Sequence, residues 1–223
     1  MTSTVMTNTA VTGTIDTVDA RRPTPFEQIV GIDGGLPGEA AAEHFLARAI
    51  HALRQEGVHV GTAATHRAQV DEIPHVSLSL SMSPTADAAG VVELLSSLLN
   101  TAGTTTGAIW TGGSGIGLPA LQGSAEQAAA AHHDRSSGRV VRFPGSDKLT
   151  GTVTVADVLS TAIDRIEVLG GGDPAPGSLL VTRDFLRPRW NSGRLVLHVQ
   201  PAVGDTWVPF ETPKPTPCCA NHN

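Results

Sequence analysis

The chain has 223 residues, of which 40% are apolar and 16% charged, and its formal net charge is −6. This length suits one large domain or two small ones and is enough to bury a hydrophobic core. The acidic excess and the lack of a basic stretch argue against nucleic-acid binding, and no apolar run approaches the ~20 residues of a membrane-spanning helix. Two cysteines are too few for a disulfide framework.

Residues 1–24 are dominated by threonine and small side chains, and we expect them to form a disordered tail. The segment lacks the basic start and apolar stretch of a secretory signal. We therefore expect a soluble cytoplasmic protein that neither enters nor crosses a membrane and whose cysteines stay reduced.

The first predicted helix covers about residues 37–56. Pro37 suits the first helical position, where its missing N–H group costs nothing, and Gly57 suits the left-handed position after the helix end. Apolar residues follow the helical spacing of three and four and predict one buried stripe, made of Ala42, Phe45, Leu46, Ala49, Ile50 and Leu53.

The second clear element is a strand over residues 76–82, in which apolar residues alternate with serines. This period of two predicts a core face and a serine face, and the serine face is expected to be the uncovered side. It is then available to solvent, to a partner or to the second half of the chain. A helix capped by Ser83 and begun by Pro84 is expected next, followed by a short strand over residues 107–110.

Further strands at residues 28–32 and from residue 58 complete the order βαββαβ. This order is typical of a ferredoxin-like fold, in which two helices cover one face of an antiparallel sheet. A doubly wound parallel sheet is the alternative, but no helix is predicted between residues 58 and 82. The sequence thus predicts the α+β class, with a ferredoxin-like N-terminal half over residues 25–111.

The remainder predicts a second small α/β half over residues 112–211 and a Pro-rich tail over residues 212–223. We expect the strands of residues 178–183 and 194–200 to pair as a hairpin. The other elements expected in this half are a helix over 124–133, strands over 139–143 and 149–155, and a helix over 156–168.

A glycine-rich loop, GGSGIGLP at residues 112–119, follows a predicted strand and precedes a predicted helix. In that context backbone N–H groups can cradle a phosphate, so the loop is a candidate anion or cofactor site. Its spacing is G-x-G-x-G rather than G-x-G-x-x-G, and a turn between the halves is the alternative. The candidate residues are Gly113, Ser114, Gly115 and Gly117.

A basic segment near the C-terminus carries Arg187 and Arg189. Arginine forks bind carboxylate or phosphate well, so these two residues are a second candidate for holding an anionic ligand. The alternative is a solvated hairpin loop with one Arg–Asp pair, for which Asp184 is the nearby carboxylate.

The last six residues contain Cys218, Cys219 and His222. Thiolates and imidazole are ligands for soft or borderline transition metals, which makes zinc or copper the expected cofactor. The adjacent cysteines have Cα atoms ~3.8 Å apart, too close for an unstrained disulfide. Because three donors leave a metal shell incomplete, another part of the protein or another subunit must complete it.

No diagnostic catalytic motif occurs, so catalytic residues stay unassigned and enzymatic activity stays open. The leading hypothesis is an accessory or binding protein whose thiol tail engages a metal or a protein partner. The alternatives are a substrate of a modifying enzyme that acts on the Cys–Cys tail, an enzyme or anion-binding protein that uses the Gly112–Gly117 loop, and a structural subunit of a homo-oligomer.

Overall fold

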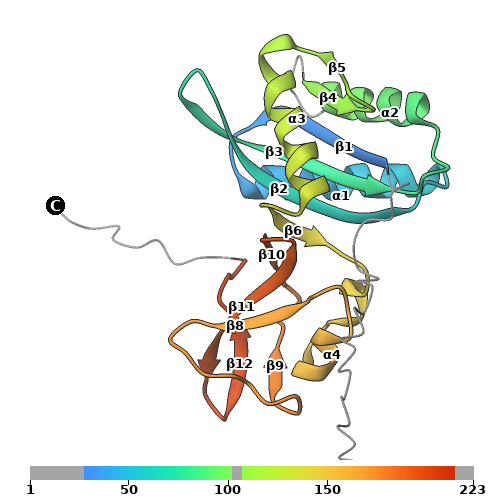
Figure 1. The fold of residues 1–223 in the computed structure, drawn as a ribbon. Coiled ribbons are helices and arrows are strands. Elements are labelled where there is room, and N and C mark those ends of the chain that lie inside the picture. Colours follow the sequence, from blue (N-terminus) through green and yellow to red (C-terminus); the bar gives the residue numbers. More distant parts are fainter. Residues whose placement is uncertain (1–27, 102–106, 214–223) are drawn as a thin grey trace, which may run out of the picture.

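The computed structural model describes residues 28–101 and 107–213, which form a mixed α+β fold with four helices and a twelve-stranded sheet. Figure 1 shows two bodies joined by β6 and β10. No helix within the described residues is long and apolar enough to cross a membrane.

The first body (residues 28–134) holds the three long helices and the two longest strands. Its elements are β1 (Gln28–Leu36), α1 (Glu39–Gln55), β2 (Val60–Val70), β3 (Ile73–Met82), α2 (Ala88–Thr101), β4 (Ala108–Thr111), β5 (Ser114–Gly117) and α3 (Pro119–Asp134).

The second body (residues 135–213) is built mainly from short strands. Its elements are β6 (Arg139–Arg142), a 3₁₀ turn (Ser146–Lys148), β7 (Thr152–Thr154), α4 (Val155–Leu159), β8 (Arg165–Val168), β9 (Leu179–Val181), β10 (Arg189–Asn191), β11 (Arg194–Ala202) and β12 (Thr206–Pro209).

The sheet of the first body has the order β5-β4-β1-β3-β2, and each neighbouring pair is antiparallel. It continues into the second body through β6, which pairs with β2, and from β6 to β10 through one residue pair, Arg139 with Arg189. The bodies are therefore joined in the sheet by the pairing of β2 with β6, and the narrow step, from β6 to β10, lies within the second body.

The α1 helix confirms the predicted stripe, because the six apolar residues of that stripe are its buried residues. Gly57 adopts a φ of 74° just beyond the helix, the left-handed conformation that glycine reaches at little cost. The α2 helix begins later than expected: the Asp87 carboxylate, rather than Ser83, accepts hydrogen bonds from the backbone N–H groups of Ala89 and Gly90.

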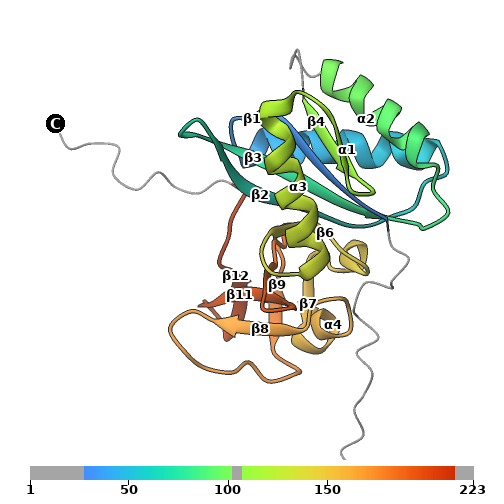
Figure 2. The same ribbon diagram turned by 45° about the horizontal axis from the view of Figure 1, so that its top comes forward.

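Three helices sandwich the sheet of the first body (Figure 2). Helices α1 and α2 pack on the face that carries Val30, Ile32, Leu78 and Leu80, which form the main hydrophobic core. Helix α3 packs on the opposite face, against β1, β3 and β4.

The serine face of β3 is buried rather than open to solvent, and the second half of the chain, one of the three neighbours expected for it, covers it. Ser77, Ser79 and Ser81 are at most 1% exposed. The covering element is α3, which comes from residues that the sequence assigns to the second half. Its alanines allow a close approach: a Cβ atom placed on Gly31 of β1 would overlap the backbone carbonyl group of Ala125.

Two predictions about the second body are wrong. The helix expected over residues 156–168 ends at Leu159, because residues 165–168 instead pair in parallel with β11 and gain a ladder of backbone hydrogen bonds. The expected hairpin does not form: β9 pairs with β7 and β12, whereas β11 pairs with β8, β10 and β12.

Candidate functional site

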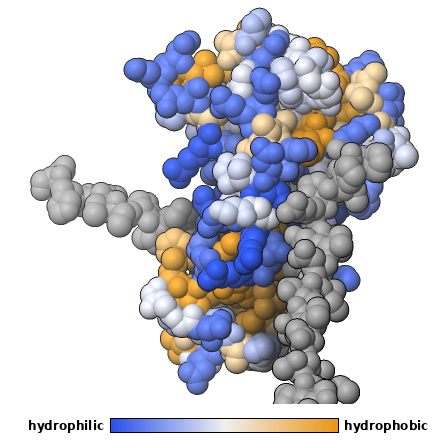
Figure 3. Space-filling model, viewed as in Figure 1, coloured by the Kyte–Doolittle hydropathy of each residue, from blue (hydrophilic) through white to orange (hydrophobic). Residues whose placement is uncertain are grey.

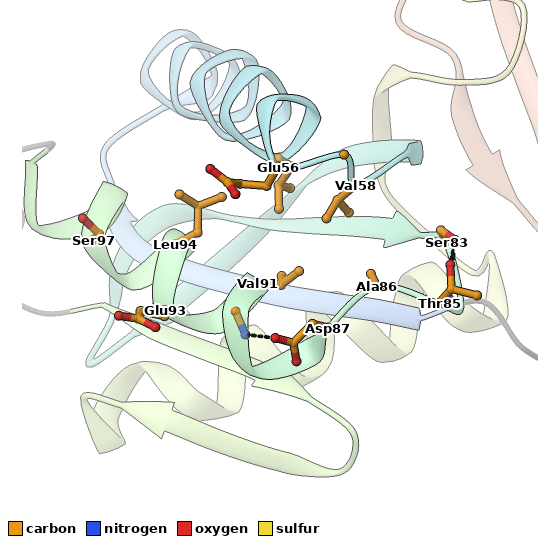
Figure 4. A pocket seen from close by; sticks show the side chains of 13 residues that line it. Glu56, Val58, Ser83, Thr85, Ala86, Asp87, Val91, Glu93, Leu94 and Ser97 are labelled. Atoms are coloured by element: carbon orange, nitrogen blue, oxygen red, sulfur yellow. Dashed lines mark hydrogen bonds between the residues drawn. The ribbon is translucent and has the colours of Figure 1, made fainter.

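A groove lies between the C-terminal end of α1 and the start of α2 (Figure 4). It has a volume of about 590 Å³, and we call it the α1–α2 groove. Its floor is apolar and comes from Leu53, Val58, Val91 and Leu94, while backbone and hydroxyl groups of the loop before α2 line one end. The groove is open to solvent and large enough for a few side chains of a ligand.

The charged residues that line the α1–α2 groove are all acidic. Of its thirteen lining residues, Glu56, Asp87 and Glu93 are acidic and none is basic. Asp87 caps α2, as described above, but Glu56 and Glu93 are exposed and take part in no ion pair within the described residues. The groove therefore offers an apolar surface with two available carboxylates.

A second candidate feature is a buried cluster of polar side chains around Asp33. The carboxylate of Asp33 in β1 accepts hydrogen bonds from His75 Nε2 at 2.6 Å, from the Ser124 hydroxyl and from the backbone N–H group of Gly35 at 2.8 Å. His75 Nδ1 faces the backbone oxygen of Ile73. Asp33 is fully buried, so these partners replace the water that its charge requires.

A neighbouring cluster joins three elements. The Ser79 hydroxyl of β3 lies 2.8 Å from His66 Nε2 and 2.8 Å from His132 Nδ1, and the His132 ring packs on Trp190 of the second body. Burial lowers the pKa of His66 to about 4 and, together with the nearby His66, that of His132 to about 3. Both rings are therefore neutral in the folded protein near pH 7.

The two clusters contain residue types used in catalysis, but their geometry is that of structural contacts. In Asp33, His75 and Ser124 the serine and the histidine both bind the carboxylate, so the histidine is not placed to take the serine proton. None of the three cavities described in this section is lined by a member of either cluster. Their demonstrable role is to hold α3 on the sheet.

The candidate arginines Arg187 and Arg189 face carboxylates. Arg187 donates to both oxygens of Glu43, with distances of 2.5 and 3.1 Å, and its guanidinium group stacks 3.9 Å above the Phe185 ring. Arg189 lies 3.4 Å from Glu211. This arrangement is neither an open anion site nor a solvated loop with one Arg–Asp pair. Glutamates from other elements occupy the forks, the Arg187 side chain is only 13% exposed, and Asp184 instead accepts a hydrogen bond from the backbone N–H group of Gly151.

These pairs belong to an ion-pair network centred on Arg139, whose side chain is 6% exposed. Arg139 contacts Glu39 and Glu43 of α1 and also Glu211, near the last described residue. Although burial acts to raise it, the pKa of Glu43 lies below its ordinary value because Arg187 and Arg139 bind the carboxylate. The network ties α1, β6 and the C-terminal end of the second body together.

A second cavity, of about 310 Å³, adjoins this network. It is lined by Leu169, Leu197 and Phe210 together with Arg187, Arg189, His198, Pro209 and Glu211. Figure 3 shows apolar surface over the second body on the face in view. Leu169 and Phe210 are two exposed apolar residues of the second body. A third cavity of about 650 Å³, between α4 and β8, is polar and bordered by the loop after β8.

The predicted glycine loop is a β-hairpin. Gly112 and Gly113 form its turn with φ of 58° and 83°, and Ser114, Gly115 and Gly117 belong to β5, the edge strand that pairs with β4. Its backbone groups thus take part in strand pairing. Five strands separate β5 from β10 in the sheet order, so the glycine residues and Arg189 do not form one site.

The candidate metal ligands Cys218, Cys219 and His222 lie outside the described residues. Within residues 28–101 and 107–213, no group of three or more His, Cys, Asp or Glu side chains is arranged to hold a metal ion.

The sequence did not single out the α1–α2 groove or the buried histidine clusters. The groove depends on how the end of α1 meets the start of α2, which no local pattern encodes. The strict alternation of serine and apolar residues in β3 did signal a polar face, and the Ala-rich α3 is the matching small-residue surface. Neither a family model nor a curated protein nor a solved structure matches this chain.

Proposed function

We propose that this chain is an accessory binding protein that presents a cysteine-bearing tail, through which it holds zinc or copper together with a protein partner or a second copy of itself. The observation that carries the proposal is the placement of the thiols. Both cysteines of the chain, Cys218 and Cys219, and the nearby His222 stand within its last six residues. They are thus separated in sequence from the packed body.

The body supports this proposal by fixing the point at which the tail begins. Glu211 is held by the buried Arg139 and by Arg189, and it stands two residues before Pro213, the last described residue. Cys218 is five residues beyond Pro213, and an extended chain of that length reaches ~17 Å. The described chain therefore ends close to the cavity that Arg187, Arg189, Phe210 and Glu211 line.

The donor set indicates the class of metal. Thiolate and imidazole favour zinc and copper over magnesium or calcium, which prefer oxygen ligands. Two adjacent thiolates and one imidazole leave a tetrahedral shell one ligand short. A partner chain that supplies the fourth ligand would couple metal binding to protein association.

We also propose that the first body belongs to the ferredoxin-like class. The element order β1-α1-β2-β3-α2-β4, the strand order β4-β1-β3-β2 and the antiparallel pairing support this assignment. The additional hairpin strand β5 and helix α3 distinguish it from the simplest form of that fold. Since one fold serves many functions, the assignment does not itself identify a ligand.

The reactivity of the two thiols provides a test of the metal-binding proposal. The rate at which a chromogenic disulfide reagent modifies Cys218 and Cys219 is measured on the full chain with and without one equivalent of zinc. We expect fast modification without metal and at least ~tenfold slower modification with it, because a metal-bound thiolate is a poorer nucleophile. His222→Ala is expected to weaken the protection, whereas His51→Ala, an exposed histidine of α1, serves as the matched control. Equal rates with and without zinc would overturn the proposal.

The intact mass of the chain from its own host tests the alternative in which a modifying enzyme acts on the tail. A mass that matches the sequence leaves the thiols free for metal. A covalent group mapped to Cys218 or Cys219 would replace the metal proposal with the modification alternative.

A further inference from the structure

We infer that the segment Arg21–Phe26, which lies just before the described residues, docks in the α1–α2 groove of its own chain. The inference is independent of the tail proposal, because it concerns the opposite end of the chain and a different surface. It is carried by where the described chain begins, by one unpartnered buried atom, by charge and by length.

The described chain begins at the mouth of the groove. The Gln28 side chain donates hydrogen bonds from Nε2 to the backbone oxygen of Ala86 at 3.0 Å and to that of Pro84 at 3.3 Å. Ala86 itself lines the groove. These contacts fasten the first described residue to the loop before α2, so the residues before Gln28 start from that loop.

The same side chain carries an unsatisfied acceptor. Gln28 Oε1 is buried and has no hydrogen-bond partner among the described residues. An unpaired buried acceptor is unfavourable, and a donor from an adjacent segment would satisfy it. A backbone N–H group of residues close to Gln28 is the donor of shortest reach.

The charge and the apolar surface of the segment complement those of the groove. Arg21 and Arg22 bring two positive charges to a groove whose lining contains carboxylates and no basic residue. Figure 4 shows the Glu56 side chain extending toward Leu94, so one available carboxylate stands at the far wall from Ala86. Phe26, with Pro23 and Pro25, suits the apolar floor.

The length of the segment Arg21–Phe26 also agrees with the length of the groove. From Asp87 to Ser97 the α2 helix rises ~15 Å, at 1.5 Å per residue. An extended segment covers that distance in about five residues, at ~3.3 Å per residue. Because Phe26 is two residues from Gln28 and Arg21 and Arg22 are six or seven, Phe26 meets the near part of the floor while the arginines reach Glu56 and Glu93.

Docking in cis needs only weak contacts, since the linked segment is present at a high effective concentration. Exposed ion pairs are screened by salt, so the contact should weaken as ionic strength rises.

A zero-length carbodiimide crosslinker applied to the full chain with Arg22→Lys provides the test. It joins an amine to a carboxylate in contact, and peptide mass spectrometry locates the product. We expect the amine introduced at position 22 to crosslink to Glu56 or Glu93, and Glu56→Gln with Glu93→Gln to abolish the product. Lys148 and Lys214, the native lysines, act as internal controls and should not link to these two residues.

Mixing isotopically heavy and light chains separates the outcomes. A crosslink confined to heavy–heavy and light–light products supports docking within one chain. Mixed heavy–light products would mean that a second copy supplies the segment, and the absence of any crosslink from position 22 to the groove would mean that the segment does not enter it. Either result overturns the inference.

Hydrogen exchange gives a second measurement that needs no crosslink. In the full chain with Arg21→Glu and Arg22→Glu, the amides around Val91 and Leu94 should exchange at least about threefold faster than in the native chain, because a covering segment slows local opening. Arg21→Lys with Arg22→Lys is the matched control and should leave the rates unchanged. Equal exchange in the charge-reversed and native chains contradicts the docking.

Discussion

The Nδ1 atom of His132 lies 2.8 Å from the hydroxyl oxygen of Ser79, and this contact fastens α3 to a serine face that would otherwise meet solvent. His66 contacts the same oxygen from β2, and Trp190 covers the His132 ring from the second body. One hydroxyl group therefore joins the sheet, its covering helix and, through that helix, the other body.

Stability is expected to fall as the pH decreases from about 6.5. In the unfolded chain His66 and His132 titrate near 6.5, but burial holds their folded pKa values at about 4 and about 3. Between the folded and the unfolded pKa of each histidine, the unfolded chain binds a proton that the folded chain does not bind. The free energy of unfolding therefore decreases with falling pH by up to ~1.4 kcal/mol per pH unit for each histidine.

The measurement is urea unfolding at several pH values between 4 and 7. His132→Gln should flatten the profile, because the substituted side chain cannot take up a proton. The exposed His51 is the control, since His51→Gln should leave the slope of the native chain unchanged. A native profile with no slope below pH 6.5 would show that the buried rings do not resist protonation.

Gly31→Ala should destabilise the protein, because the new Cβ atom meets the backbone of α3 at Ala125 and a helix backbone cannot yield as a flexible side chain does. We expect a loss of at least ~2 kcal/mol in the free energy of unfolding. At Gly123, within α3 itself, an added Cβ atom would meet open space, so Gly123→Ala should be neutral or stabilising by up to ~1 kcal/mol. Thermal unfolding of the two variants checks both signs.

Arg139→Met is expected to cost about 3 kcal/mol of stability. The substitution leaves Glu39, Glu43 and Glu211 without their shared cation, and removing one member of a buried ion pair is far more costly than losing an exposed pair. Arg189, whose side chain is 48% exposed, also pairs with Glu211. Arg189→Met should cost under ~1 kcal/mol, and equal losses of unfolding free energy in urea for the two variants would show that burial does not set the strength of the network.

Local patterns predicted the elements whose apolar spacing is regular. The buried stripe of α1 and the alternation of β3 follow directly from period, and both are observed. Solvent, a partner and the second half of the chain were all left open as neighbours of the serine face, because nothing within residues 76–82 indicates that an alanine-rich helix, distant in the sequence, will cover it. The cover depends on how the surface of β3 fits the surface of α3, and the two segments are far apart in the sequence.

The second body was harder to predict for the same reason. Val158, Leu159, Ile163 and Ile166 fit a helical spacing, yet the last of them belongs to a strand, because pairing with β11 satisfies its backbone groups better than a lone helix end would. Short strands such as β10 and β12 carry little pattern of their own.

The candidate sites, too, could be predicted from the sequence only in part. One Arg–Asp pair was the expected alternative for the basic segment, but the sequence could not indicate that Glu43, 144 positions before Arg187, supplies the carboxylate that Arg187 binds. The glycine hairpin satisfied the strand–glycine–helix pattern of a phosphate loop, although strand pairing uses its backbone. The cysteine tail stays a prediction, since its residues lie outside those that the structure describes.

The most direct test of the proposed function is the zinc stoichiometry of the native protein, measured by native mass spectrometry on three chains. These are the full chain, a chain ending at Thr216, and the full chain with Cys218→Ser and Cys219→Ser. We predict that zinc is retained by the full chain alone, as one ion per chain or one shared between two chains, because the other two lack the thiolates. Equal zinc content in all three chains, or none in the full chain, would contradict the proposal that the tail is the metal-binding element.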